Sequence, residues 1–372
     1  MKIAHIFESI SDSGVSNVIL RLEESMKKMG HEVDCITWKK PTVPFEGVTL
    51  KQVEIEGLSN SKGFKKNFLK LFFGVRIAEM LCSGDYVKKL NNKLSLKSYD
   101  LIFVHGLSVI PMWKIRESSF FVLHNTKSKL LLSRRFPFLN VFLRKMYFYI
   151  YKSHRLLTVS NGIKKDIIDC FKLPEKHFVQ SVFNPFPINK IKSLSDEVLS
   201  SKIKVPQKYL MSMGRLVRAK RFDRLILAYK KSGVNMPLYI FGSGGKKGQL
   251  VRLIEKLDLK DKVFIFDYIS NPFPYLKNAH AFILSSDFEG FANVLIESLI
   301  CGTPIVSTNC KSGPNEILVN EYSKWLCAVN DSDQLANLIV EIVKNPYQVN
   351  PAMYQRFSSE KIAQHYLDCI NY

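Results

Sequence analysis

The sequence predicts an α/β protein of two domains, each built on a parallel sheet that helices cover. Its 372 residues are more than one hydrophobic core commonly serves, and the apolar share of 46% is enough for two cores. Short apolar runs of strand length alternate with amphipathic stretches of helical spacing along the chain. This alternation is typical of parallel strands that are connected by helices.

Apolar runs place the expected strands of the first half at 1–7, 101–105, 120–124, 155–160 and 177–183, with a helix that begins at Asn161. The segment Asn184-Pro185-Phe186-Pro187 then interrupts regular structure, because proline lacks an N–H group and restricts the residue before it. From 188 to about 206 the chain is polar and rich in Ser and Lys, which indicates a linker or a surface helix. We therefore expect the first domain to span residues 1–187.

A new α/β unit begins at Lys208, within a second domain that we place at residues 188–352. Its expected strands are 209–213, 238–241 and 281–284, and its expected helices include 224–231 and 334–343. Apolar residues at helical spacing between 353 and 372 predict a closing helix.

The formal net charge of +21 predicts an anionic partner, which is nucleic acid, anionic lipid or a phosphorylated substrate. From Lys127 to Arg155 there is no acidic residue, and cations interleave with aromatic side chains, as they do on membrane surfaces. A second basic and apolar stretch, from Lys65 to Arg76, has the same character. The alternative is an ordinary helix that turns its apolar side to the core and its lysines to water. No helix-turn-helix, zinc-finger or RNA-binding signature supports nucleic acid as the partner.

No apolar run is long enough to cross a membrane and no signal peptide pattern opens the sequence, so we expect a cytoplasmic protein. The seven cysteines lack metal or redox spacing and are expected to be buried free thiols. Asp331-Ser332-Asp333 resembles a manganese-binding carboxylate pair. Because it directly precedes a helical stretch, we interpret it as a helix N-cap and expect no metal.

Cations cluster between the end of the strand at 209–213 and the start of the helix at 224–231. Arg215 and Lys220 could neutralise a diphosphate there, because ligands of parallel sheets bind at the carboxyl ends of strands. The alternative is a solvated basic turn. A second strand, 238–241, ends in the glycine-rich turn Gly242-Ser243-Gly244-Gly245, where backbone can approach a ligand.

Two carboxylates follow the strand at 281–284. If a helix begins near Ala292, Glu289 lies in the loop before it and Glu297 lies on its second turn. The backbone amides at the start of that helix are then available to an anion.

These three segments, followed by Cys301-Gly302-Thr303-Pro304 and Ser312-Gly313-Pro314-Asn315-Glu316, resemble the donor half of retaining glycosyltransferases of family 4. The first half resembles the family more faintly, in Ser13-Gly14, Val104-His105-Gly106, Leu123-His124-Asn125 and Val159-Ser160-Asn161-Gly162. The chain departs from the family at Ser13, where a double glycine is common, and at Asp267, where a glycine often precedes the base pocket.

The resemblance implies the GT-B fold, with two facing Rossmann-like domains and a C-terminal helix that crosses back to the first. It implies that Arg215 and Lys220 bind the donor diphosphate, that Glu297 binds the ribose and that Glu289 contacts the transferred sugar. The other donor contacts that it implies are Gly14, Gly242, Ser243, Tyr268 and the amides of Phe291, Ala292, Asn293 and Val294. His124, and with less support His105, is the first-domain candidate for a sugar contact.

The expected activity is retaining, metal-independent hexosyl transfer from a nucleotide sugar, a UDP-sugar by expectation, to a lipid-linked or polysaccharide acceptor. We expect this on the inner face of the cytoplasmic membrane, in lipopolysaccharide, O-antigen or capsule assembly. A GT-B sugar-nucleotide epimerase or hydrolase is the alternative enzyme, and a basic nucleic-acid-binding protein is the alternative of another class. An NAD dehydrogenase is disfavoured, because the loop from Glu8 to Gly14 lacks the required glycine fingerprint.

Overall fold

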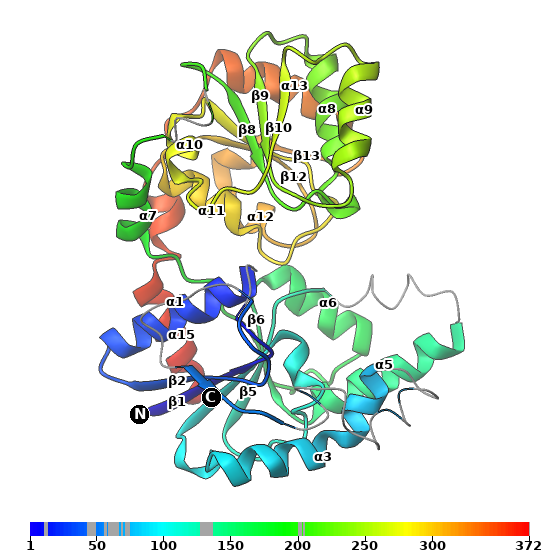
Figure 1. Cartoon of the computed structure of the whole chain (residues 1–372), viewed down its shortest axis with the longest axis vertical. Helices are drawn as coiled ribbons and strands as arrows, with labels where there is room; N and C mark the ends of the chain where they lie inside the picture. The colour runs from blue at the N-terminus through cyan, green and yellow to red at the C-terminus, as the bar shows by residue number, and fades with distance from the viewer. Residues whose placement is uncertain are drawn as a thin grey trace. The chain divides into compact units, whose positions relative to one another are not determined.

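The computed structural model describes residues 1–10, 14–42, 50–55, 58, 67, 70, 75–126, 137–199, 203 and 205–371. The chain divides into two compact units (Figure 1). Unit 1 consists of Met1–Pro185 together with Ser359–Tyr372, and unit 2 consists of Phe186–Ser358.

Unit 1 is a parallel sheet with the strand order β3-β2-β1-β4-β5-β6-β7 among its described residues. Its strands are β1 (Lys2–Phe7), β2 (Glu32–Thr37), β3 (Leu50–Gln52), β4 (Leu101–His105), β5 (Ser119–Leu123), β6 (Arg155–Thr158) and β7 (Val179–Ser181). Its main helices are α1 (Gly14–Lys28), α3 (Val75–Lys93), α5 (Pro137–Lys152), α6 (Asn161–Phe171) and α15 (Ser359–Asp368). The order reverses between β1 and β4, and at such a reversal the connecting loops diverge and leave room for a ligand.

Unit 2 repeats this plan with the strand order β10-β9-β8-β11-β12-β13, which reverses between β8 and β11. Its strands are β8 (Leu210–Met213), β9 (Leu238–Phe241), β10 (Val263–Phe266), β11 (Ala281–Leu284), β12 (Ile305–Thr308) and β13 (Leu326–Cys327). Its helices include α7 (Ile188–Ser195), η3 (Arg218–Lys220), α8 (Phe222–Ser232), α9 (Lys247–Lys256), α10 (Phe273–Asn278), α11 (Asn293–Ile300), α12 (Pro314–Ile317), α13 (Ser332–Lys344) and α14 (Ala352–Gln355).

The central strands are buried along their whole length, because helices cover both faces of a parallel sheet. β4, β9 and β11 therefore read as continuous apolar runs, and each is buried at every position. Two helix starts follow the capping rules. At α6, Ser160 Oγ accepts a hydrogen bond from the Ile163 amide at 3.1 Å. Asp331 accepts from the amides of Asp333 and Gln334, which confirms that it is the N-cap of α13.

The closing helix is shorter than the expected range 353–372. α14 ends at Gln355, α15 begins at Ser359, and Phe357 between them is buried in unit 2 against Phe291. The apolar positions of this segment therefore serve two cores, which periodicity alone does not reveal. α15 packs against α1 in unit 1, as expected of a helix that returns to the first domain (Figure 1).

For the segment from 188 we expected a linker or a surface helix, and the structure has helix α7 there. Six of the seven cysteines are buried free thiols, and Cys170 is partly exposed. None of the described helices combines the length and apolar content needed to cross a membrane.

Candidate functional site

The loops that follow β8 and β11 meet at the reversal point of the unit 2 sheet. Lys220 Nζ donates to Glu289 Oε1 at 2.6 Å, and Ser286 Oγ donates to the same oxygen at 2.6 Å. Both partners of the ion pair are largely buried, with side-chain exposures of 19% for Lys220 and 11% for Glu289. The structure thus brings together two of the residues that the sequence singled out.

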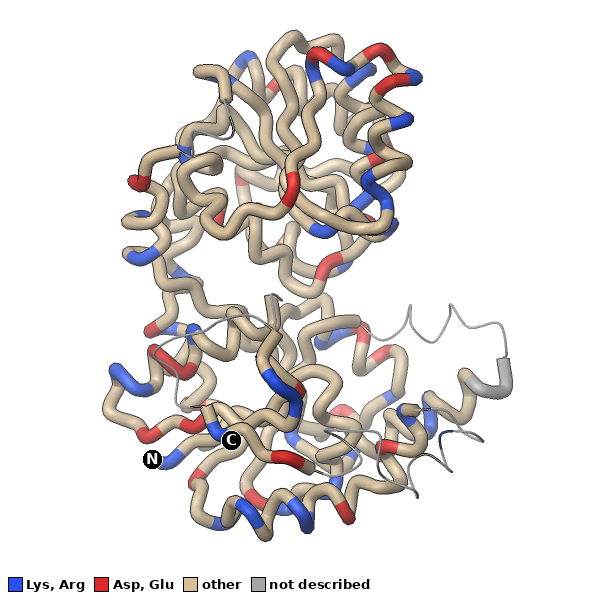
Figure 2. The backbone as a smooth tube through the Cα atoms, viewed as in Figure 1, with Lys and Arg blue, Asp and Glu red and all other residues tan. Residues whose placement is uncertain are grey.

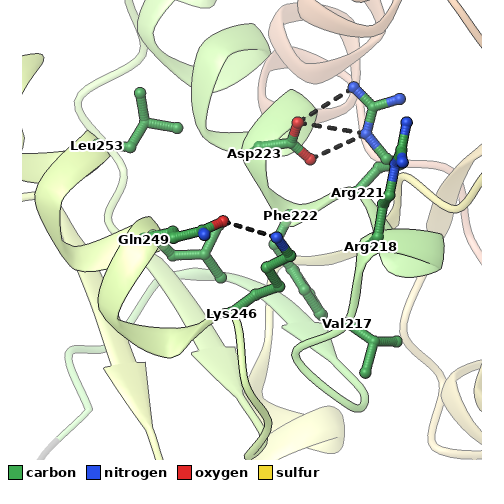
Figure 3. Close-up of a pocket in the computed structure, with 9 residues that line it drawn as sticks. Val217, Arg218, Arg221, Phe222, Asp223, Lys246, Gln249 and Leu253 are labelled. Atoms are coloured by element: carbon green, nitrogen blue, oxygen red, sulfur yellow. Dashed lines mark hydrogen bonds and ion pairs between the residues drawn. The ribbon is translucent and has the colours of Figure 1, made fainter.

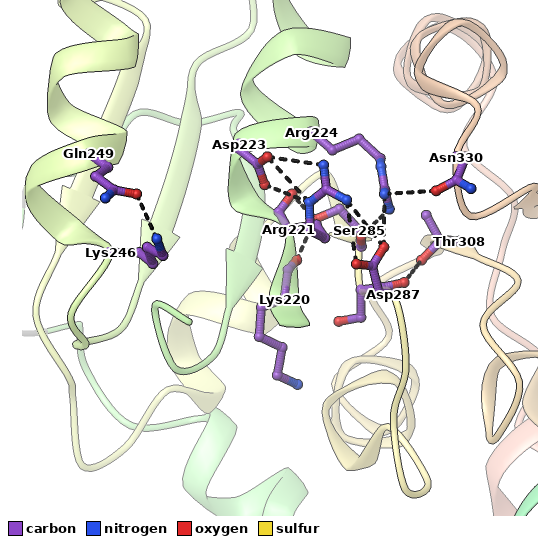
Figure 4. A network of polar contacts seen from close by, with 11 residues as sticks. Lys220, Arg221, Asp223, Arg224, Lys246, Gln249, Ser285, Asp287, Thr308 and Asn330 are labelled. Atoms are coloured by element: carbon purple, nitrogen blue, oxygen red, sulfur yellow. Dashed lines mark hydrogen bonds and ion pairs between the residues drawn. The ribbon is translucent and has the colours of Figure 1, made fainter. Parts of the chain in front are cut away.

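A second ionic network supports these loops (Figure 4). Arg224, whose side chain is 5% exposed, donates to Asp287 Oδ1 at 2.8 Å and to the Ser285 carbonyl at 3.2 Å. Arg221 donates to both carboxylate oxygens of Asp223 and reaches Asp287 Oδ2 at 3.4 Å. A buried arginine with several acceptors holds a loop in one conformation, because each lost contact leaves a charge without a partner.

Backbone contacts complete this support. Ser285 Oγ donates to the carbonyls of Lys220 and Arg221, and the Asp287 amide donates to Ala219 O at 2.9 Å. Thr308 Oγ1, at the end of β12, donates to Ser286 O at 2.7 Å (Figure 4). The positions of Lys220 and Glu289 are therefore fixed by neighbouring main chain.

Arg215 lies in the same loop, two residues beyond the end of β8. Its side chain is exposed, and it has no hydrogen bond or ion pair with the other described residues. Its guanidinium group is thus available to an anion beside Lys220, in contrast to the arginines that support the loop.

The glycine-rich turn after β9 packs directly on the loop after β8. A Cβ at Gly242, whose φ is +154°, would lie 1.9 Å from Gly214 O. The Gly214 amide donates to Phe241 O at 3.0 Å, and the Leu216 amide donates to Ser243 O at 2.8 Å. The sequence interpretation assigned these glycines to ligand approach, whereas the structure uses them for close contact between two loops. Ser243 beside them is exposed.

Helix α11 begins beyond Glu289, with Ala292 as its N-cap in the left-handed conformation (φ 55°). Phe291 and Ala292 are buried, while Asn293, Val294 and Glu297 are partly exposed. Gly313 packs directly against this turn. Only glycine fits there, because a Cβ at position 313 would lie 2.5 Å from Phe291 O. Glu289 is thus in the loop and Glu297 on the helix, as predicted.

A pocket lies beside η3, between the start of α8 and helix α9 (Figure 3). It is lined by Val217, Arg218, Arg221, Phe222, Asp223, Lys246, Gln249, Leu250 and Leu253. None of the residues predicted to bind the donor lines it. Tyr268, predicted for the base pocket, is 59% exposed beyond β10, and the neighbouring Asp267 pairs with Lys247 at 2.6 Å.

The first-domain candidates occupy the carboxyl ends of β1, β4 and β5. Gly14 is the first residue of α1, and Ser13 lies outside the described residues. His105 ends β4 and His124 follows β5, and both are buried. Their ring nitrogens, Nδ1 of His105 and Nε2 of His124, lie 3.1 Å apart.

The basic aromatic stretch is divided by the structure. Lys127, Lys129, Arg134 and Arg135 lie outside the described residues, as does most of the stretch from Lys65 to Arg76. On α5, Tyr147 and Tyr151 are buried in the core, so these two aromatic residues of the stretch cannot face a membrane. Their spacing of four residues places them on the same side of the helix, and this side faces the core.

The outer side of α5 keeps the predicted character. Phe142 and Tyr149 are 47% and 65% exposed, and Lys145 is exposed between them. Arg144 donates to Cys170 O at 2.9 Å and so caps the end of α6. Lys and Arg occur over both units, so the net charge is not confined to this helix (Figure 2).

Sequence reasoning missed Arg224, Asp287 and Ser286, which orient the predicted residues. A signal was present, because Arg224 carries a charge on the otherwise apolar side of α8 and is buried there. Among the described residues, no group of three or more His, Cys, Asp or Glu side chains is placed to hold a metal ion.

Comparison with known proteins follows the division into halves. Residues 13–179 match the family model "Glycosyltransferase Family 4", and residues 196–363 match "Glycosyl transferases group 1". An N-acetylgalactosamine-N,N'-diacetylbacillosaminyl-diphospho-undecaprenol 4-alpha-N-acetylgalactosaminyltransferase from Campylobacter jejuni is 32% identical over 186 residues, which are 50% of this chain and 49% of that protein. The chain spans about half the length of the first curated relatives it matches.

Several solved structures are similar over the whole chain. A sucrose-phosphate synthase from Thermosynechococcus elongatus gives a TM-score of 0.77 at 17% identity, covering 100% of this chain and 98% of that one. Anabaena HepE in complex with UDP gives a TM-score of 0.73 at 17% identity, covering 100% of both chains. These likenesses confirm the predicted GT-B fold. With a family model on each half and this fold, the chain belongs to the group 1 glycosyl transferases of glycosyltransferase family 4.

Proposed function

We propose that the chain is a retaining glycosyltransferase that moves a hexosyl group from a UDP-sugar to a lipid-linked or polysaccharide acceptor. The observation that carries the proposal is the pairing of Lys220 with Glu289 at the reversal point of the unit 2 sheet. A cation for a diphosphate and a carboxylate for sugar hydroxyls are thereby held side by side. A UDP complex of the similar HepE supports the choice of nucleotide.

In this proposal the leaving diphosphate is met by cations. Lys220 and the exposed Arg215 bind its oxygens, and the amides of Asn293 and Val294 at the start of α11 add partial positive charge. Because negative charge develops on the diphosphate as the anomeric bond breaks, these groups stabilise the transition state more than the ground state. No step in this scheme requires a metal.

The remaining predicted contacts orient the donor. Glu297 on α11 binds the ribose hydroxyls, and Glu289 contacts the transferred sugar. Ser243 and Tyr268 are exposed beyond β9 and β10 and line the base site, and Gly14 lets the first loop approach the diphosphate. His124 binds a hydroxyl of the sugar.

The transfer itself exchanges two bonds at the anomeric carbon. The bond to the donor phosphate oxygen breaks, and the bond to the acceptor oxygen forms on the same face of the sugar. The departing phosphate oxygen takes the proton of the acceptor hydroxyl, so no separate enzymic base is needed.

We propose an acceptor at the inner face of the cytoplasmic membrane, within bacterial surface-polysaccharide assembly such as lipopolysaccharide, O-antigen or capsule. The exposed face of α5, with Phe142, Lys145 and Tyr149, has the aromatic and cationic character that suits an anionic bilayer. A relative from Campylobacter jejuni whose name includes a diphospho-undecaprenol acceptor supports the lipid-linked class.

Incubation of the protein with radiolabelled nucleotide sugars and a bacterial membrane extract tests this function. We expect label in the lipid fraction with a UDP-sugar and none with a Glu297→Ala variant. Hydrolysis of the nucleotide sugar without label in any lipid or polysaccharide fraction contradicts the proposed transfer and indicates a hydrolase.

A further inference from the structure

Three buried histidines form one chain of ring contacts across unit 1. His5 Nδ1 lies 2.9 Å from His105 Nε2, and His105 Nδ1 lies 3.1 Å from His124 Nε2. His5 is on β1, His105 ends β4, and His124 follows β5, so the chain crosses the point where the strand order reverses. The exposures of 0%, 1% and 6% exclude water from the inner links.

The two inner rings are neutral. Burial lowers the pKa of His5 to about 3, and burial together with the neighbouring His5 and His124 lowers the pKa of His105 well below its usual value. A neutral imidazole has one N–H donor and one bare nitrogen that accepts. Each inner ring must therefore donate on one side and accept on the other.

Only two directions of hydrogen bonding satisfy such a chain, and the far nitrogen of His5 distinguishes them. His5 Nε2 is buried and has no hydrogen-bond partner among the described residues. If His124 donated toward His5, this nitrogen would carry a buried hydrogen without an acceptor. Buried N–H groups without partners are rarer than buried acceptors without partners. If hydrogen bonds are instead donated from His5 toward His124, His5 Nε2 carries only a lone pair.

We infer that His5 and His105 are positioning residues that fix the tautomer of His124. His5 Nδ1–H donates to His105 Nε2, and His105 Nδ1–H donates to His124 Nε2. Neutral His124 therefore carries its hydrogen on Nδ1, and Nε2 is occupied as an acceptor. Histidines whose second nitrogen is held by a neighbour have their tautomer and ring orientation set by it.

The consequence for transfer rests on the proposed function of His124 at the sugar. A ring whose N–H is on Nδ1 donates a hydrogen bond to a sugar oxygen that approaches this nitrogen. It does not take a proton from the acceptor through Nε2, because that lone pair is engaged with His105. The hydrogen bonds among the three histidines thus favour a binding role for His124, with proton transfer left to the departing phosphate.

Long-range proton–nitrogen NMR on the full chain with 15N-labelled histidine tests the direction. The spectra distinguish a protonated from a bare ring nitrogen, and single His→Gln variants assign the eight histidines. We expect the hydrogen on Nδ1 in His5, His105 and His124 at pH 7. A hydrogen on Nε2 of His5 or His105 overturns the inference whatever the activity of the enzyme is.

An isosteric pair of variants tests whether the direction matters. In His5→Asn the amide can still donate to His105, whereas the carboxylate of His5→Asp only accepts and reverses the chain. We expect His124 to keep Nδ1–H in His5→Asn and to shift to Nε2–H in His5→Asp. If His124 keeps Nδ1–H in His5→Asp while the introduced carboxyl group is ionised, the inference is contradicted. If the His5→Asp variant does not fold, the NMR result on the unmodified chain decides.

Kinetics of the same two variants distinguish the tautomer set by the three histidines from the proposed contact of His124 with the sugar. We expect kcat of His5→Asp to fall about tenfold or more relative to His5→Asn, with the affinity for UDP unchanged, because a hydrogen bond to the sugar is withdrawn. If the tautomers are as expected but the kcat values are equal, the direction of hydrogen bonding among the histidines is supported and the sugar contact of His124 is contradicted. His154→Gln is the matched control, since this buried ring contacts Ile150 O and Ile115 O and lies outside the chain. It is expected to leave the tautomer of His124 unchanged.

Discussion

Lys220 Nζ lies 2.6 Å from Glu289 Oε1, and the contact joins the loop after β8 to the loop after β11. A diphosphate that approaches Lys220 competes with Glu289 for its ammonium group. Once Lys220 turns to the phosphate, Glu289 is free to accept hydrogen bonds from sugar hydroxyls. In the proposed function the pair would therefore couple binding of the leaving diphosphate to binding of the transferred sugar.

Replacement of Lys220 should weaken nucleotide binding selectively. We expect Lys220→Ala to lower the affinity for UDP about 10-fold to 100-fold, because a charge-assisted hydrogen bond contributes about 1.5–3 kcal/mol. Arg218→Ala is the control, since Arg218 is an exposed cation of the same turn. Calorimetry with UDP measures both variants, and an equal loss in both indicates only a general effect of charge.

Glycine is required at position 242 by the neighbouring loop. Gly242→Ala places a Cβ 1.9 Å from Gly214 O, so the two loops must separate. We expect unit 2 to lose about 2–4 kcal/mol of unfolding free energy, as strained backbone and overpacking each cost about 1–3 kcal/mol. UDP affinity should fall as well, because Lys220 lies on the displaced loop.

Gly248→Ala is the matched control for Gly242. Gly248 lies in α9, and a Cβ there meets nothing within 4 Å. Alanine in a helix is favoured over glycine by about 0.5–1 kcal/mol, so this variant should be slightly more stable than the native chain. Urea unfolding measures both, and similar behaviour of the two variants contradicts the loop contact.

Membrane affinity is expected to depend on the outer face of α5. We predict that the double variant Phe142→Ser, Tyr149→Ser reduces flotation with anionic vesicles several-fold, because both side chains are exposed and leave water on binding. Lys145→Gln should weaken flotation further, and high salt should reduce that difference. Val251→Ser changes an exposed apolar residue of α9 in unit 2 and should leave flotation unchanged. Unaltered flotation of the α5 variants contradicts the membrane surface.

The sequence predicted the central strands well because they are buried on both sides. The runs at 101–105, 238–241 and 281–284 coincide with β4, β9 and β11, and the apolar pattern alone defines them. Short edge strands such as β3 and β13 carry no such pattern and were not anticipated. The interior strands β2 and β12 were also not among the expected strands. The basic and aromatic composition of the stretch from Lys127 to Arg155 did not tell which aromatic side chains of the helix meet the core, and Tyr147 is one that does.

For the candidate site, the sequence singled out Lys220 and Glu289 but not the residues that hold them in place. Lys220 and Glu289 stand out at the ends of strands, where parallel sheets bind ligands. Arg224 and Asp287 act through contacts between loops that are 63 residues apart in the chain, and no local pattern reports such contacts. The same holds for His5, whose role appears only when β1 and β4 are placed side by side.

The stability of unit 1 should fall as the pH falls below about 6.5, the pKa of an exposed histidine. The pKa of His5 in the folded chain is about 3, so its ring stays neutral in the folded state while it gains a proton in the unfolded state. The unfolded state therefore binds more protons between these two values, and acid favours unfolding. For His5 alone the loss between pH 7 and pH 5 is about 2 kcal/mol, and His105 shifts in the same direction.

Urea unfolding at pH 7, 6 and 5 measures this dependence in a Trp325→Phe background, in which Trp38 and Trp113 report unit 1. His5→Asn removes one buried ring, so its loss of stability between pH 7 and pH 5 should be smaller than that of the native chain by about 2 kcal/mol. His365→Asn is the control, because this ring is exposed on α15 and lies outside the three buried histidines. An identical pH profile for His5→Asn and the native chain would show that folding does not lower the pKa of His5. The ring of His5 would then gain a proton between pH 7 and pH 5 in the folded state as well, which contradicts the neutral inner ring at low pH.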